Sequence, residues 1–190
     1  MAHTTIVRWV HHYDPEFERR WNQLAQPVGP SWRVDETYVK IRGKWAYLCR
    51  AVDREGKTAN PRLSIRRDVT AAKAFFCNAI KVQGAPPRTI TLDGYAASHR
   101  ALRDKQAGGQ LPNDTKLRSS KYLNNLIEQD DRGVKSRIGP MLGFKRFETA
   151  AITIAGIDLL RRIQKEQFNL RRLRLKSRSA PTVWNAELAA

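Results

Sequence analysis

The sequence is poor in cysteine and has no long apolar run. Its 190 residues include two cysteines, Cys49 and Cys77, which are far apart and form no CxxC pair. This spacing excludes a disulfide framework and a structural zinc site, and it makes a reducing cytoplasm the expected setting. No apolar run approaches the roughly 20 residues that a membrane span requires, and the opening MAHTTIVRWVHHYD contains no apolar signal core. We therefore expect neither a membrane partner nor secretion.

Acidic residues are few compared with basic ones. Lys and Arg together number 35 and Asp and Glu 18, which gives a formal net charge of +17. Such an imbalance is typical of proteins that bind a polyanion, most often nucleic acid, although a basic surface can also serve solubility alone. The hydrophobic share of 41% excludes a disordered basic tail, and the length allows one full domain and part of a second.

A three-stranded antiparallel meander is predicted first. Residues 32–41 (WRVDETYVKI) and 44–53 (KWAYLCRAVD) are rich in aromatic and β-branched residues and are joined by a turn at Arg42–Gly43. Residues 57–67 predict a third strand, which contains Pro61. Because proline cannot donate to a sheet ladder, this strand is expected at the sheet edge or with a bulge.

The flanking segments predict helices and one further strand. Residues 4–24 predict a helical stretch that is interrupted at Asp14–Pro15, with Asp14 as the N-cap of a second helix. Residues 26–30 predict a linker. Thr70 is expected to cap the next helix. The remaining predictions are a buried strand at 88–93 and helices at 96–106, 121–138 and 146–168. A meander followed by a crossover predicts a mixed α/β sheet with strand 88–93 parallel to the first strand and beside it.

Three carboxylates occupy informative places in this arrangement. Asp35 lies in the first strand, Asp93 ends the strand at 88–93, and Glu128 lies on the helix at 121–138. If the two strands are neighbours, these acids can form a cluster that repels itself unless divalent cations such as Mg²⁺ bind to it. Two such ions can activate a water or a 3′-hydroxyl and stabilise the leaving oxygen in an attack on phosphorus. The alternative is that the three are scattered surface acids.

The helix that carries Glu128 also has a polar face. Lys135 follows Glu128 by nearly two helical turns and shares this face with Asn125 and Arg132, where a cation can hold a DNA phosphate. The alternative is an ordinary amphipathic helix with a solvated charged face. Two other acids are excluded by direction, because strand alternation places Glu36 opposite Asp35 and Asp130 lies about 200° around the helix from Glu128.

These segments resemble the DDE transposases of bacterial insertion sequences. Residues 122–160, YLNNLIEQDDRGVKSRIGPMLGFKRFETAAITIAGIDLL, are especially similar to the insertion-sequence-six family. WRVDETYVKIRGKWAYLCRAVDREGKT resembles its first-acid region and TITLDGYAASHRAL its second. Residues 94–127, 34 in number, separate Asp93 from Glu128, as is typical of that family, and Lys135 matches its lysine seven residues after the glutamate.

The resemblance implies a ribonuclease-H-like fold, with a mixed five-stranded sheet flanked by helices. It implies Asp35, Asp93 and Glu128 as both the catalytic and the metal-binding triad, with two Mg²⁺ ions that Mn²⁺ can replace. It further implies 3′-end cleavage and strand transfer on transposon-end and target DNA, giving cointegrates, by a homo-oligomer in the bacterial nucleoid. The residues expected to bind DNA are Lys121, Asn125, Arg132, Lys135 and Arg137.

The chain is expected to divide at residues 30 and 168. Residues 1–30 resemble only the end of the family's helix-turn-helix region and its linker, which predicts an N-terminally truncated protein. Residues 31–168 are the expected catalytic domain and 169–190 a basic tail. Residues 161–178 contain eight basic residues and one acid, which favours DNA contact over a solvated helix end.

Two other functions remain open from the sequence. One is a catalytically inactive, DNA-binding remnant, a hypothesis based on the incomplete helix-turn-helix region. Asp131 and Gly133 stand where family members often have His and Lys, and each is expected to lower activity without removing the triad. A general ribonuclease-H-like nuclease acting on RNA–DNA hybrids is the other, and Lys135 argues against it.

Overall fold

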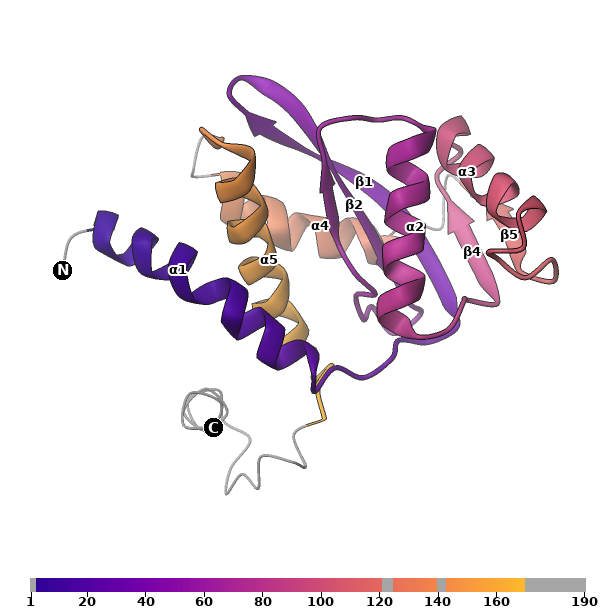
Figure 1. Ribbon diagram of the computed structural model, residues 1–190, viewed down its shortest axis with the longest axis horizontal. Coiled ribbons are helices and arrows are strands. Elements are labelled where there is room, and N and C mark those ends of the chain that lie inside the picture. The colour runs from indigo at the N-terminus through magenta and orange to yellow at the C-terminus, as the bar shows by residue number, and fades with distance from the viewer. Residues whose placement is uncertain (1–2, 121–124, 140–142, 170–190) are drawn as a thin grey trace. The chain divides into compact units, whose positions relative to one another are not determined.

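The chain folds into a five-stranded sheet with helices on both faces. The computed structural model describes residues 3–120, 125–139 and 143–169, and of residues 3, 4, 6, 7 and 125–131 it describes the backbone alone. The elements, labelled in Figure 1, are α1 (His3–Asn22), β1 (Ser31–Ile41), β2 (Lys44–Val52), β3 (Arg62–Ser64), α2 (Val69–Gln83), β4 (Thr89–Leu92), α3 (Ala96–Ala107), β5 (Lys116–Ser119), α4 (Asn125–Ile138) and α5 (Phe147–Gln164).

The sheet is mixed, as the sequence predicts. Its strand order is β3-β2-β1-β4-β5, with β2 antiparallel to β1 and β3, and β4 parallel to β1 and β5. The connection through α2 therefore places β4 on the edge of β1 opposite to β2. Both the mixed sheet and the placement of the fourth strand beside the first are confirmed.

The two faces of β1 pack against different helices. Trp32 and Val34 are buried in a core with Phe75 and Phe76 of α2 and Leu102 of α3. Because side chains alternate along a strand, Asp35 points to the other face, together with the buried Thr37, Val39 and Ile41. That face lies against α4, which contacts β1 and β2 and buries its own Val134 and Ile138.

The chain forms two compact units. One contains residues 27–154, and the other contains residues up to 26 together with residues from 155. In the second unit, Trp21 of α1, Leu159 of α5 and Phe168 form a small separate core. The predicted domain boundaries at 30 and 168 stay predictions. In the described part of the chain, no helix combines the length and apolarity that would let it cross a membrane.

Three local predictions are wrong. α1 continues through Pro15 with Asp14 inside it, because Asp14 packs against the α5 backbone at Gly156 and a long helix tolerates the single hydrogen bond that proline removes. Asp68, not Thr70, caps α2, since its side chain accepts from the Ala71 N–H. The predicted strand at 57–67 is reduced to β3, although its place at the sheet edge is confirmed.

Candidate active site

Asp35 and Asp93 are brought together by the register of two parallel strands. β1 and β4 pair Ser31 with Thr89 and continue in step to Val34 with Leu92. Asp35 directly follows Val34, and Asp93 directly follows Leu92. The two aspartates therefore stand side by side at the carboxyl end of β4. This is the juxtaposition that the sequence predicts, and it depends on residues 58 positions apart.

The backbone fixes the orientation of both carboxyl groups. Asp35 Oδ1 accepts the N–H of Glu36 at 2.8 Å, and Asp93 Oδ1 accepts the N–H of Tyr95 at 3.0 Å. Between Asp93 and Tyr95, Gly94 has φ of +95°, a conformation that favours glycine, and this allows the chain to turn directly after the acid. Both carboxylates are half-buried, so solvent and a substrate can reach them.

A buried cation lies in the strand next to these acids. Arg50 of β2 pairs with Asp35 across the antiparallel ladder and is completely buried. Residues directly opposite each other in such a ladder project from the same face of the sheet. A permanent positive charge on this face lowers the electrostatic cost of gathering carboxylates there.

The third predicted acid lies on α4, the helix that packs on the same face as Asp35. Glu128 belongs to the first half of α4, and its side chain lies outside the described residues. In the described part of the chain, no three His, Cys, Asp or Glu side chains converge in a way that could hold a metal ion. The structure therefore joins two of the three predicted ligands, and the place of the third is given by its helix alone.

The predicted DNA-binding residues divide in the same way. Arg132, Lys135 and Arg137 project from the exposed side of α4, and Arg137 donates to the carbonyl of Gly133 at 3.1 Å. Lys121 lies outside the described residues, and so does the side chain of Asn125. Within residues 161–178, Arg162 is buried. It donates to Asn22 and lies over the ring of Phe168. Arg162 therefore does not contribute to the DNA contact predicted for this segment.

A linked set of side chains beside the acids was not predicted from the sequence. Arg67, which precedes α2, donates through Nε to Glu36 at 2.6 Å, and its guanidinium carbon lies 3.9 Å from the centroid of the Tyr95 ring. The Tyr95 hydroxyl donates to the Arg67 carbonyl at 2.8 Å. Glu36 follows Asp35 and Tyr95 follows Asp93 by two residues, so Arg67 connects the two acid-bearing segments. No sequence spacing indicates it, because Arg67 lies among several basic residues.

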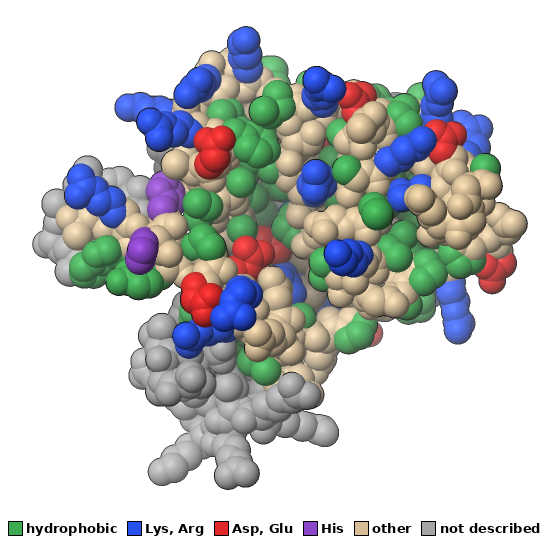
Figure 2. All heavy atoms as spheres, in the orientation of Figure 1, with side chains coloured by type: hydrophobic (Ala, Val, Ile, Leu, Met, Phe, Trp, Pro, Cys, Tyr) green, Lys and Arg blue, Asp and Glu red, His purple; other side chains and the backbone are tan. Residues whose placement is uncertain are grey.

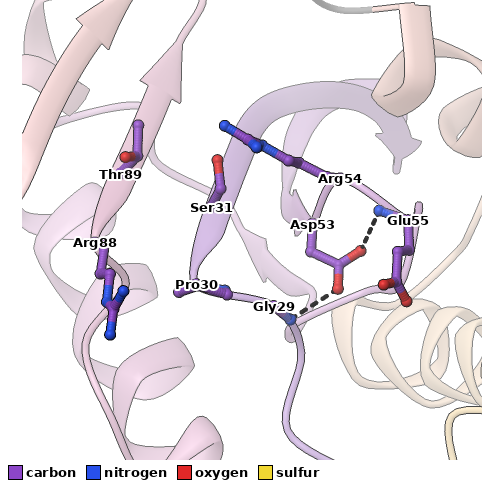
Figure 3. Close-up of a pocket in the computed structure, with 8 residues that line it drawn as sticks. All are labelled: Gly29, Pro30, Ser31, Asp53, Arg54, Glu55, Arg88 and Thr89. Carbon is purple, nitrogen blue, oxygen red and sulfur yellow. Dashed lines mark hydrogen bonds between the residues drawn. The ribbon is translucent and has the colours of Figure 1, made fainter.

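A cavity lies at the opposite end of the same strands. It has a volume of about 390 Å³ and is lined in part by Ser31 and Thr89, the first residues of β1 and β4, and by Arg54 and Arg88. Figure 3 shows Asp53 turned toward the backbone, where it accepts the N–H groups of Gly29 and Glu55. Asp53 thus organises a loop, and the cavity is separated from Asp35 and Asp93 by the length of β4.

The two cysteines also differ from each other. Cys49 is buried in the core next to Glu36, and burial together with that carboxylate raises the pKa of its thiol to about 12. Cys77 is exposed on α2.

Comparison with known proteins agrees with this geometry. A family model described as a DDE domain matches residues 29–167. The transposase for insertion sequence-like element IS431mec of Staphylococcus aureus is 38% identical over 164 residues, which cover 86% of this chain and 71% of that protein. The transposase for insertion sequence element IS257 in transposon Tn4003, from the same species, matches to the same extent.

A solved structure shares the fold. The HTLV-2 integrase catalytic core domain in complex with magnesium, in its trimeric form, superposes with a TM-score of 0.50 at 16% identity, over 85% of this chain and 99% of that chain. The predicted ribonuclease-H-like architecture is therefore confirmed.

Proposed function

The chain belongs to the DDE transposases of bacterial insertion sequences, of the insertion-sequence-six type, and we propose that Asp35, Asp93 and Glu128 are its catalytic acids. In this proposal the protein hydrolyses a phosphodiester at each 3′ end of its element. Water attacks phosphorus, the bond to the 3′ oxygen breaks, and a 3′-hydroxyl is released. That hydroxyl then attacks a phosphodiester of target DNA, which joins the two molecules and releases a second 3′-hydroxyl.

The observation that carries this proposal is the β1–β4 register. Two carboxylates of a strongly basic chain stand on adjacent parallel strands, and their backbone hydrogen bonds hold them in fixed directions. Side-chain alternation turns Asp35 toward the face that α4 covers, and α4 carries Glu128. This arrangement supports a shared site for the three acids.

The donor set fits hard divalent cations. Carboxylate oxygens without nearby imidazole or thiolate partners are the ligands that Mg²⁺ prefers, and Mn²⁺ accepts the same set. When bound between Asp35, Asp93 and Glu128, two such ions would lower the pKa of an attacking water and neutralise charge on the reacting phosphate. The residues of this chain orient that chemistry, since the N–H groups of Glu36 and Tyr95 hold one oxygen of each aspartate in a fixed direction.

DNA is the proposed substrate and partner. Arg132, Lys135 and Arg137 expose three cations on the helix that carries Glu128, where each can contact a backbone phosphate. Such contacts position DNA without reading its sequence. Two element ends must react together, so we propose that the protein acts as a homo-oligomer on DNA.

Cleavage assays with conservative variants test the proposal. Asp35→Asn, Asp93→Asn and Glu128→Gln each keep the shape of the side chain and remove its charge, and each should lower Mg²⁺-dependent nicking of element-end DNA at least 10³-fold while binding persists. Asp114→Asn, which changes an exposed acid in a turn, is the matched control and should cleave normally.

Other outcomes of the same assay separate the alternatives. Nicking that survives all three substitutions disproves the triad. Binding of element ends with no cleavage by the unaltered chain, in Mg²⁺ or Mn²⁺, favours a non-catalytic DNA-binding protein. Preferential cleavage of an RNA–DNA hybrid over duplex DNA favours a ribonuclease.

A further inference from the structure

The outer half of the β1–β2 hairpin exposes aromatic side chains. Tyr38 and Lys40 of β1 and Trp45 and Tyr47 of β2 project from one face of this hairpin, and we refer to these four residues as the aromatic face. The relative exposure of Tyr38 is 46% and that of Trp45 is 58%, both high for large rings. Nearer the start of β1, the same face is covered by α2, and Figure 1 shows the hairpin tip extending beyond that helix.

The rings hold one another in place. The centroids of Tyr38 and Trp45 are 6.1 Å apart with their planes at 78°, and those of Tyr38 and Tyr47 are 5.5 Å apart at 64°. These are edge-to-face contacts, in which each ring limits the rotation of its neighbour. The exposed surfaces of Tyr38 and Trp45 are therefore prearranged for a flat partner.

Cations lie beside the rings. Lys40 Nζ is 6.0 Å from the centroid of Trp45, and the guanidinium carbon of Arg67 is 5.7 Å from that of Tyr38. Glu36, on the same face of β1, is paired with Arg67. Figure 2, in the orientation of Figure 1, shows basic and hydrophobic side chains side by side over the hairpin.

We propose that the aromatic face binds unpaired nucleobases of the DNA substrate, with Trp45 and Tyr38 stacking on the bases and Lys40 contacting the adjoining phosphate. Base–aromatic stacking with nearby cations is the general way in which proteins hold single-stranded DNA. This inference rests on the proposed function, because it takes DNA as the substrate. A purely apolar protein partner fits less well, since basic groups border both exposed rings.

The position of the aromatic face agrees with this occupant. Tyr38 follows Asp35 by three residues on the same strand, about 10 Å at the rise of a β-strand. Tyr38 projects from the face opposite to Asp35, so the path between them crosses the edge of β1. The pairing with β4 ends at Val34 and Leu92, and Phe144 bonds to the same edge only from Lys40 onward, so in the described part of the chain neither segment pairs with the stretch between them. A DNA strand with its scissile phosphate at the acids can therefore pass over this edge and place its next one or two bases on the aromatic face.

Binding measurements with the full chain test the inference. The probe is a duplex with a short single-stranded extension that contains 2-aminopurine, compared with the same sequence fully paired, both without divalent metal so that no cleavage occurs. Trp45→Leu should weaken binding of the extended DNA about tenfold, or about 1.4 kcal/mol, and abolish the quenching of 2-aminopurine, while the paired duplex binds nearly as before. Trp45→Phe, which keeps a ring, should retain most of the affinity.

Matched variants decide between the remaining outcomes. Ile65→Ala removes another exposed apolar side chain, 66% exposed, and should change neither affinity nor quenching. Tyr38→Leu gives a second test if Trp45→Leu reduces the thermal stability. Equal losses on both DNAs, or no loss on either, overturn the inference. A change in self-association by light scattering without a change in DNA affinity also overturns it, and assigns the aromatic face to a contact between copies.

The binding assay is independent of catalysis. Asp35→Asn should abolish cleavage and leave the 2-aminopurine signal intact, so failure of the proposed triad and failure of the base-binding surface give different results.

Discussion

The guanidinium of Arg67 lies against the ring of Tyr95, with 3.9 Å between the guanidinium carbon and the ring centroid. Arg67 also pairs with Glu36 at 2.6 Å. Because Glu36 adjoins Asp35 and the Tyr95 N–H binds Asp93, this single arginine links the backbone segments that present both aspartates. We regard Arg67 as a positioning residue, since it acts through Glu36 and Tyr95, the neighbours of the two acids.

Arg67→Lys should raise the Mg²⁺ concentration needed for half-maximal cleavage. Lysine keeps the positive charge but loses the flat stacking on Tyr95 and the directed Nε bond, so the separation of Asp35 and Asp93 is less well fixed. We expect a rise of about 3- to 30-fold in a metal titration of DNA cleavage, with little change in maximal rate. Arg66→Lys, which changes the exposed neighbour, is the control. An unchanged metal dependence for Arg67→Lys would show that the link has no role in the site.

The stability of the unit containing α1 should depend on the charge of Asp14. Burial, with a smaller contribution from Glu18, raises the pKa of Asp14 from 3.8 to about 6. The folded state then binds a proton more readily than the unfolded chain, so the free energy of unfolding falls as pH rises from about 4 to about 6. Asp14→Asn should remove this pH-dependent loss of stability. At pH 7.5 it should raise the free energy of unfolding by about 1 kcal/mol, a value that allows for solvent screening of the partly exposed side chain.

Thermal unfolding at several pH values checks this prediction. The stabilisation by Asp14→Asn should be large at pH 7.5 and vanish near pH 4. Asp114→Asn is the control for loss of an exposed charge. A melting temperature difference between Asp14→Asn and the unaltered chain that is the same at all pH values would contradict the assignment.

The two thiols should react at very different rates. Cys77 is exposed, whereas Cys49 is buried and its thiol has a pKa of about 12. Since the thiolate is the reactive form, iodoacetamide at pH 8 should modify Cys77 within minutes and leave Cys49 unmodified until the protein unfolds. Peptide mass spectrometry distinguishes the two sites. Early modification of Cys49 under native conditions would show that this core opens readily.

Gly143→Ala should destabilise the contact between the hairpin and the segment after α4. Gly143 has φ of +99°, and a Cβ there would lie 3.0 Å from the carbonyl oxygen of Lys40. That same oxygen accepts the N–H of Phe144 at 2.9 Å, so it has little freedom to move. We expect a loss of about 2–3 kcal/mol in chemical denaturation. Gly109→Ala has a positive φ but open space around it, and should cost about 1 kcal/mol or less.

Most of the sheet could be predicted from the sequence because its signals are local. The aromatic and β-branched residues of 32–41 and 44–53 gave two strands, and the right-handed rule placed β4 beside β1. β5 was not located, since KLRS has no alternating pattern and is defined by its pairing with β4. The continuity of α1 through Pro15 was missed for a related reason, because it depends on the packing of Asp14 against a residue more than a hundred positions away.

The site was predictable where strand topology determines it. The juxtaposition of Asp35 and Asp93 follows from two strands and a crossover, and family resemblance added Glu128. The Arg67 link and the aromatic face depend on which side chains remain exposed after α2 has packed, and no periodicity in the sequence reveals that. Tyr38 and Trp45 lie in strands that the sequence predicts, but their exposure could not be predicted from it.

The hydrogen-bond register between β1 and β4 has a consequence for how such a protein can change over evolution. The turn after β2, the loop around β3 and the length of α2 can all gain or lose residues without separating the two aspartates, because none of them sets the offset between the paired strands. A deletion of one residue within positions 31–34 would act quite differently. It would rotate Asp35 to the opposite side of the sheet and bring Glu36 into its place. Insertions and deletions should therefore accumulate in the turn after β2, around β3 and in α2, and should be absent from positions 31–34.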